Sequence, residues 1–89
     1  MHALFVTASI SDYDAAQKEL HEEGIPMVSQ APGFVAGYWL RPVEDGKGNS
    51  VIVFDSEEAA ERGREGLEQN PPREVTIDSI EIREVAGHA

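Results

Sequence analysis

Short continuous runs of apolar residues alternate along the chain with stretches in which apolar residues recur at helical spacing. The continuous runs carry the aromatic and β-branched side chains typical of strands, and three of them lie at residues 3–8, 34–41 and 51–54. A fourth strand is predicted over 75–85, where two apolar pairs have opposite parity, Val75 with Ile77 and Ile80 with Ile82. This change of phase predicts a β-bulge or a bend near Asp78 and Ser79.

A first helix is predicted over residues 12–23. Its apolar face has the spacing i, i+3, i+4 and i+7 and consists of Tyr13, Ala16, Gln17 and Leu20. Ser11 is the expected N-cap. Gly24 is expected to end the helix in the left-handed conformation, because Pro26 then prevents the helix from resuming. Residues 25–33 are therefore predicted as a loop.

A second helix is predicted to begin after Asp55 or Ser56 and to end at Asn70. Its inner face is made of small residues with one large one, namely Ala59, Ala60, Gly63, Leu67 and, at the margin, Gly66. Such a face either brings a helix close to a sheet or leaves space for a ligand. Our hypothesis is that an apolar cavity lies between this helix and the sheet, with Met27 and Val28 at its rim.

The order of the elements is strand, helix, strand, strand, helix, strand. Residues 44–49 are rich in turn-forming residues and are predicted as the hairpin loop between the second and third strands. This order predicts an α+β fold of the ferredoxin-like βαββαβ type, in which an antiparallel sheet carries both helices on one face. We expect one domain over residues 1–89.

The third strand is apolar at four successive positions, from Val51 to Phe54. A sheet with one face in water alternates polar and apolar residues, so this strand has to be covered on both faces. Two short helices cover only one of them. The sequence therefore predicts a homodimer in which the second face of each sheet lies against a second copy of the chain.

Composition narrows the possible partners. The chain has 89 residues, and its 17 acidic and 7 basic residues give a formal charge of −10. This balance argues against nucleic acid and against anionic membranes as partners, since both bind clustered Lys and Arg. The absence of cysteine excludes a disulfide scaffold and a thiol nucleophile. No apolar run is long enough to span a membrane and no basic leader precedes one, so we expect a cytoplasmic protein.

Three short stretches resemble the antibiotic biosynthesis monooxygenase (ABM) family. They are Pro32-Gly33-Phe34, Leu40-Arg41-Pro42-Val43, and Val53-Phe54-Asp55-Ser56-Glu57-Glu58-Ala59. The resemblance implies a dimeric α/β barrel, made of two ferredoxin-like protomers with a pocket between sheet and helices in each. It also implies a cofactor-independent monooxygenase acting on an aromatic or polycyclic small molecule.

The haem-degrading branch of that family uses an Asn on strand one, a Trp at the end of strand three and a His in or after helix two. Strand one here contains no Asn, and Phe54 occupies the position that matches the Trp. Helix two and the loop after it contain no His. Haem breakdown is therefore not expected. No cluster of His, Asp or Glu has the spacing of metal ligands, and we expect neither a metal nor a cofactor.

The candidate ligand-binding residues are Trp39, Arg41, Phe54 and Gly63, whereas no catalytic residue can be assigned. Trp39 and Arg41 share one strand face, where an indole and a guanidinium could together meet a planar anion. The alternative is that Trp39 fills a core and Arg41 pairs with an acidic residue. Tyr38 has the opposite parity, and the sequence leaves open whether it or Trp39 faces the interior. His2, His21 and His88 are expected to be solvated.

Three classes of function remain open. The first is the cofactor-independent oxygenase that the resemblance implies. The second is a non-catalytic dimer that binds a small apolar ligand or takes part in a stress response. The third is an accessory protein whose acidic helices or sheet face bind another protein, although a charge of this kind commonly serves solubility alone.

Overall fold

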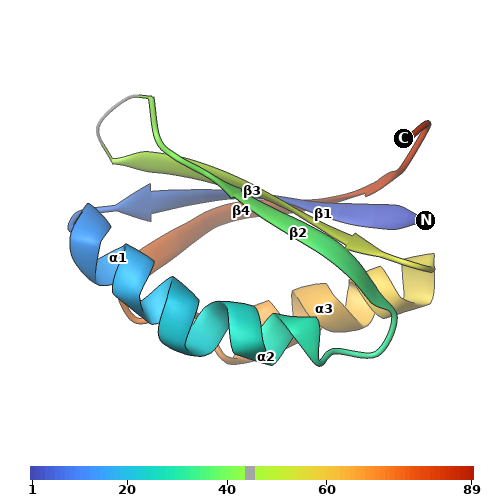
Figure 1. Ribbon diagram of the computed structural model, residues 1–89, viewed down its shortest axis with the longest axis horizontal. Coiled ribbons are helices and arrows are strands. Elements are labelled where there is room, and N and C mark those ends of the chain that lie inside the picture. The colour runs from blue at the N-terminus through green and yellow to red at the C-terminus, as the bar shows by residue number, and fades with distance from the viewer. Residues whose placement is uncertain (44–45) are drawn as a thin grey trace.

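The computed structural model describes residues 1–43 and 46–89. Its four-stranded sheet has the order β2-β3-β1-β4, and all neighbouring strands are antiparallel. The strands are β1 (His2–Ile10), β2 (Phe34–Leu40), β3 (Lys47–Phe54) and β4 (Val75–Glu84). The helical segments are α1 (Tyr13–Glu19), η1 (Leu20–Gly24), α2 (Ile25–Ser29) and α3 (Glu57–Gln69). All of them cover one face of the sheet (Figure 1), which confirms the predicted α+β, ferredoxin-like fold.

The core lies between the sheet and the helices. Its buried side chains come from the inner faces of β1, β3 and α3, and they are Leu4, Val6, Ile52, Phe54, Ala59 and Ala60. The ring of Phe34 on β2 meets Phe54 edge-on, with 6.3 Å between the ring centroids. Alternation along each strand thus places one apolar set against the helices.

Helix α3 packs very closely on the sheet. A Cβ atom added to Gly63 would lie 2.6 Å from Cζ of Phe54. The aromatic ring therefore occupies the space beneath the middle of α3, and the small residues on this helix allow close approach. The hypothesis of a cavity under Gly63 is wrong for this reason. The helix begins at Ser56, the second of the two caps considered, whose Oγ accepts a hydrogen bond from the Ala59 N–H at 3.1 Å.

The first helix differs from its prediction at both ends. Its N-cap is Asp12 rather than Ser11, because Oδ1 of Asp12 accepts a hydrogen bond from the Ala15 N–H at 3.0 Å. The chain also stays helical beyond Gly24, whose φ of −64° is right-handed.

Helical structure continues across Pro26 because one wider, π-helical turn, Leu20–Gly24, comes just before it. The N–H of Ile25 donates to the carbonyl of Leu20, five residues earlier, which is π-helical hydrogen bonding. Proline lacks the N–H of a regular turn and its ring clashes with the preceding turn. Here it stands in the first turn of α2, where an N–H is not needed. The predicted loop at 25–33 is therefore helical over its first five residues.

The predicted β-bulge is confirmed. Thr7 of β1 pairs with Ser79, whereas its neighbour Ala8 pairs with Ile77, so Asp78 is the extra residue on β4. The carboxylate of Asp78 accepts hydrogen bonds from the Ser9 hydroxyl at 2.7 Å and from the Lys47 ammonium at 3.0 Å. Because of the bulge, both apolar halves of β4 pack toward the core.

The hairpin between β2 and β3 is shorter than predicted. β3 already begins at Lys47, so residues 47–49 belong to the sheet, whereas 44 and 45 lie outside the described residues. Gly46 has a φ of 83°, which favours glycine, and its carbonyl accepts a hydrogen bond from the Ile10 N–H at 2.8 Å. This bond ties the hairpin to the end of β1.

The outer face of the sheet carries no helix (Figure 1). A row of side chains crosses this face from Tyr38 on β2 through Val51 and Phe5 to Glu81 on β4. Tyr38 is 61% exposed, and Trp39 lies on the opposite, inner face. The structure thus settles which of the two aromatic residues faces the interior. Among the described residues, no helix has both the length and the apolar character needed to cross a bilayer.

Two glycines of α3 form a matched pair for testing how closely this helix packs. We predict that Gly63→Ala lowers the free energy of unfolding by about 1–3 kcal/mol, because the added methyl group overlaps the Phe54 ring. Gly66 has no atom within 4 Å of an added Cβ, so Gly66→Ala should instead stabilise the helix by about 0.5–1 kcal/mol. Urea unfolding measures both changes. Equal effects of the two substitutions would contradict the close packing.

Candidate functional site

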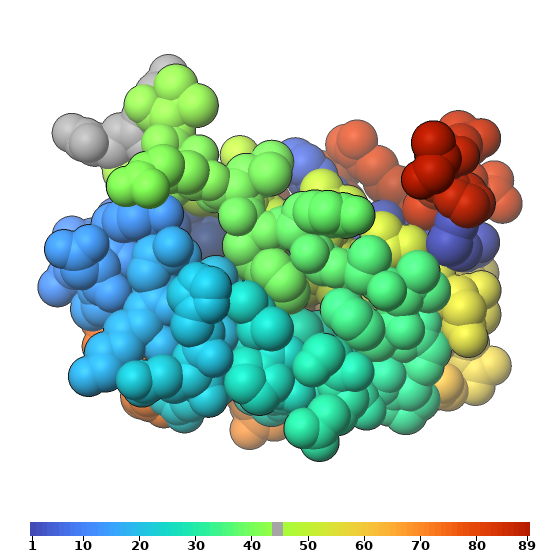
Figure 2. All heavy atoms as spheres, in the orientation of Figure 1, coloured from blue at the N-terminus to red at the C-terminus, as the bar shows by residue number. Residues whose placement is uncertain are grey.

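A cavity of about 140 Å³ lies between the sheet and the first helical segments, α1 and η1. In the space-filling view the surface is hollowed between α1, in blue, and β2, in green (Figure 2). Most of the lining is apolar and includes Val6, Ile10, Leu20, Trp39, Ile52 and Ile77. The predicted cavity between the second helix and the sheet is therefore found mainly under the first helical segments instead, and Leu67 is the residue of α3 that lines it.

Small residues on facing elements leave this space open. Ala8 and Ser50 lie on the sheet side of the cavity, and Ala16 and Gly24 lie on the helix side. Gly48 also lines the cavity, but the side chain of Ile10 fills the space beside it. At the other end of the sheet, the large ring of Phe54 fills the space between the sheet and α3. A layer that is filled at one end and lined by small residues at the other remains partly empty at the second end.

The helix face predicted from the sequence forms one wall of the cavity. All four of its residues, Tyr13, Ala16, Gln17 and Leu20, line the space. Leu20 and Gly24 bracket the π-helical turn, which also lines it. Such turns are frequent at functional sites. The helical periodicity identified the inward face of this helix correctly, whereas the cavity behind that face could not be predicted from one element alone.

Few polar side chains reach the cavity. Ser50 is only 8% exposed and pairs across the strands with Trp39, on the inner face of the sheet. Gln17 and Tyr13 add an amide and a phenol from α1. These neutral groups can donate hydrogen bonds to a ligand oxygen without the cost of burying a charge.

Glu19 is the charged residue of the lining among the described residues, and its carboxylate is already engaged. It accepts hydrogen bonds from the backbone N–H groups of Arg73 and Glu74, at 2.9 and 3.0 Å. The guanidinium of Arg73 lies 3.6 Å from Glu19 and also binds the carboxylate of Glu23. These contacts fasten the first helical segments to the residues that precede β4.

The same pairing changes the acidity of Glu23. The hydrogen bond from Arg73 holds the pKa of the Glu23 carboxyl below its ordinary value of 4.5. Glu23 is therefore ionised through the neutral pH range and keeps its ion pair with Arg73 there.

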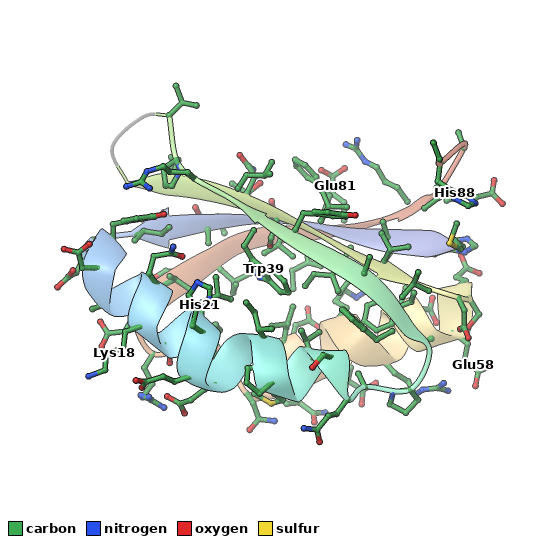
Figure 3. The ribbon with its side chains drawn as sticks, viewed as in Figure 1. Lys18, His21, Trp39, Glu58, Glu81 and His88 are labelled. Atoms are coloured by element: carbon green, nitrogen blue, oxygen red, sulfur yellow. The ribbon has the colours of Figure 1, made fainter. Side chains whose placement is uncertain are left out.

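The four candidate residues lie in three different environments. Trp39 points from β2 toward the helices and lines the cavity (Figure 3). Arg41 lies outside the lining, and its guanidinium stacks on the ring of Tyr13 at 4.9 Å from the centroid. Phe54 and Gly63 pack against each other in the core and do not line this cavity. Of the four, the structure thus brings only Trp39 to the space.

The histidines and the proposed rim residues lie away from the cavity. His21 is exposed on η1, and His88 lies near the C-terminus (Figure 3). Nε2 of His2 lies 3.9 Å from a carboxylate oxygen of Glu57. Met27 is 61% exposed, whereas Val28 packs against the core. Within residues 1–43 and 46–89, no group of three or more His, Asp or Glu side chains is placed to hold a metal ion.

Solved structures with the same fold include one oxygenase and one protein described as a putative monooxygenase. SnoaB, a cofactor-independent oxygenase from Streptomyces nogalater crystallised as a point mutant, is 16% identical; the match covers 98% of this chain and 95% of SnoaB, with a TM-score of 0.70. A putative antibiotic biosynthesis monooxygenase from Deinococcus radiodurans is 17% identical; that match covers 100% of this chain and 95% of the other, with a TM-score of 0.58.

No protein-family model matches the sequence. No curated protein matches it either. The likeness in three dimensions therefore shows that the chain has the fold of the antibiotic biosynthesis monooxygenase family.

The pairing of Glu23 with Arg73 predicts a defined pH dependence. A carboxyl whose pKa is lowered on folding adds stability above its unfolded pKa, and this stability is lost as the pH falls through the folded pKa. We therefore expect Glu23→Gln to lower the midpoint of urea unfolding at pH 7, with the difference from the wild type shrinking as the pH falls below 4.5 and vanishing once the folded carboxyl is protonated. Glu22→Gln, at an exposed neighbour on the same turn, is the control. A constant difference across this pH range would contradict the pairing.

Proposed function

We propose that the chain is a cofactor-independent monooxygenase and that the cavity binds a single-ring, electron-rich aromatic compound such as a phenol. The observation that carries this proposal is an apolar cavity of about 140 Å³ with an indole in its wall and neutral hydrogen-bonding groups beside it. The fold shared with a cofactor-independent oxygenase supports the proposed reaction class.

The size of the cavity selects one ring. An engineered apolar cavity of about 150 Å³ in another protein binds benzene. A space of about 140 Å³ therefore suits one aromatic ring. The sequence analysis expected an aromatic or polycyclic small molecule. This volume favours the single-ring aromatic compound.

Different residues of the lining contact different parts of the proposed ligand. Trp39 offers its aromatic face or edge to the ring of the ligand. The hydroxyl of Ser50 and the amide of Gln17 can donate hydrogen bonds to the phenolic oxygen, which stabilises the phenolate more than the phenol. The apolar remainder excludes water from the anion.

The proposed reaction needs no reductant besides the substrate. Dioxygen attacks the electron-rich carbon para to the phenolate oxygen, and a C–O bond forms there. The ring carbon loses its hydrogen and becomes a carbonyl, while the second oxygen atom leaves as water. One phenol and one O₂ thus give one quinone and one H₂O, with four electrons passing from the ring to dioxygen.

One observation favours a second candidate, a ligand-binding protein without catalysis. The only carboxylate among the described lining residues, that of Glu19, already accepts two backbone hydrogen bonds. A group in this position is a poor general base, because accepting a proton would break those bonds. In this candidate the same cavity holds the same class of ligand and returns it unchanged.

A second copy of the chain is the proposed partner of the bare sheet face. Tyr38 and Leu40 on this face are 61% and 56% exposed, and Val51 and Phe5 continue the apolar surface inward. Contiguous apolar surfaces of this kind mark interaction sites. Because a two-fold contact matches the same patch on both copies, the apolar row of one sheet covers that of the other.

Filling the cavity should abolish ligand binding. Ala16→Leu places a larger side chain in the cavity, so we expect loss of phenol binding in calorimetry and loss of phenol-dependent oxygen uptake. Ala15→Leu makes the same change at the next residue of α1, which does not line the cavity, and should keep both activities. Binding without oxygen uptake in the wild type would select the non-catalytic candidate. Unchanged binding in Ala16→Leu would exclude the cavity as the site.

A charge on the sheet face should separate the two copies. We expect Tyr38→Glu to convert a dimer into a monomer in sedimentation measurements, because it buries a carboxylate in an apolar interface. Gln30→Glu makes the same change of charge at an exposed residue on the helix side and should leave the dimer intact. A wild-type protein that sediments as a monomer would contradict the proposed interface.

A further inference from the structure

Gly37 and Trp39 are neighbours on the inner face of β2, and the indole lies close over the glycine. A Cβ atom added to Gly37 would lie 2.6 Å from Cη2 and 2.7 Å from Cζ3 of Trp39. These atoms form the far edge of the indole's six-membered ring. The indole therefore lies back along its own strand and covers the place where a side chain at position 37 would stand.

The space around the indole is filled on the strand side and open on the cavity side. Gly37 pairs across the strands with Ile52, which is buried in the core with 3% exposure. Trp39 itself pairs with the small residue Ser50 and lines the cavity. Carbon atoms pack at about 3.5–4.0 Å, so a methyl group at position 37 would displace the ring edge by roughly 1 Å. The cavity is the space that can accept this displacement.

We propose that Gly37 is a specificity-determining residue. Because it has no side chain, the Trp39 indole can lie back against β2, and this position of the indole sets the cavity to the size of one aromatic ring. Any side chain at position 37 drives the indole into the space that the ligand needs. The inference deepens the proposed function and rests on its premise that this cavity is the ligand site. Gly37 touches no ligand and acts through the position of Trp39.

The test uses inert hydrocarbons, so that cavity size is measured apart from catalysis. Benzene and naphthalene serve as one-ring and two-ring probes in calorimetry. We expect the wild type to bind benzene and to reject naphthalene, and Gly37→Ala to lose benzene affinity by roughly tenfold or more. Trp39→Phe removes the ring edge that lies over Gly37, and the space vacated there adds to the cavity, so this variant should admit naphthalene.

The double variant Gly37→Ala/Trp39→Phe is the decisive one. Phenylalanine lacks the atoms that meet position 37, so the double variant should recover benzene binding to within about threefold of the wild type. A general loss of stability would not be repaired in this way. Gly66→Ala, with open space around its added methyl group, is the control for a glycine replacement and should not change the binding of either probe.

The fluorescence of the protein reports the indole directly, because Trp39 is its only tryptophan. In Gly37→Ala we expect the emission to remain that of a buried indole, since the ring moves inward. Red-shifted emission would show the ring swinging out to solvent and would overturn the proposal, as would equal benzene affinity in the wild type and Gly37→Ala. If Gly37→Ala fails to fold, Trp39→Phe decides alone: continued rejection of naphthalene overturns the proposal.

The two proposals fail in different ways. A wild type that binds benzene but consumes no oxygen with phenols contradicts only the oxygenase function. A wild type that binds no benzene contradicts the proposed cavity size, whatever its oxygen uptake.

Discussion

The contact between α3 and Phe54 determines how the layer between sheet and helices is filled. Gly63 lets the helix rest directly on the aromatic ring, so this end of the layer is closed. Toward the other end, small residues such as Ala8 and Ser50 stand among the larger side chains of the sheet, and α1 with η1 covers them and leaves a cavity of about 140 Å³. The layer is thus filled at the end where α3 contacts Phe54 and partly empty at the other end.

Two local features keep the loose region in shape. The π-helical turn at Leu20–Gly24 carries the helix past Pro26, and the cavity wall is therefore continuous helix rather than loop. Glu19 and Glu23 then fasten this wall to Arg73, ahead of β4. Exposed ion pairs contribute little to stability by themselves, but here two backbone hydrogen bonds to Glu19 accompany them.

The two faces of β2 serve two different surfaces. Trp39 lies in the cavity wall, whereas its neighbour Tyr38 lies on the bare face proposed to meet a second copy. A shift of the strand by one residue would exchange these roles, so the register of β2 links the cavity to the proposed dimer contact. Gly37 shares the inner face with Trp39 and leaves the indole its room.

The sequence by itself determined the order of the elements, the fold class, the bulge at Asp78 and the inner face of the first helix. Each of these follows from periodicity or parity along one segment, which local residues record directly. Only the tertiary structure decided that Trp39 faces inward, that Gly63 seats α3 on Phe54, and that the cavity lies under α1 and η1. These outcomes depend on which side chains from distant segments fill the same space, and an empty space belongs to no single segment.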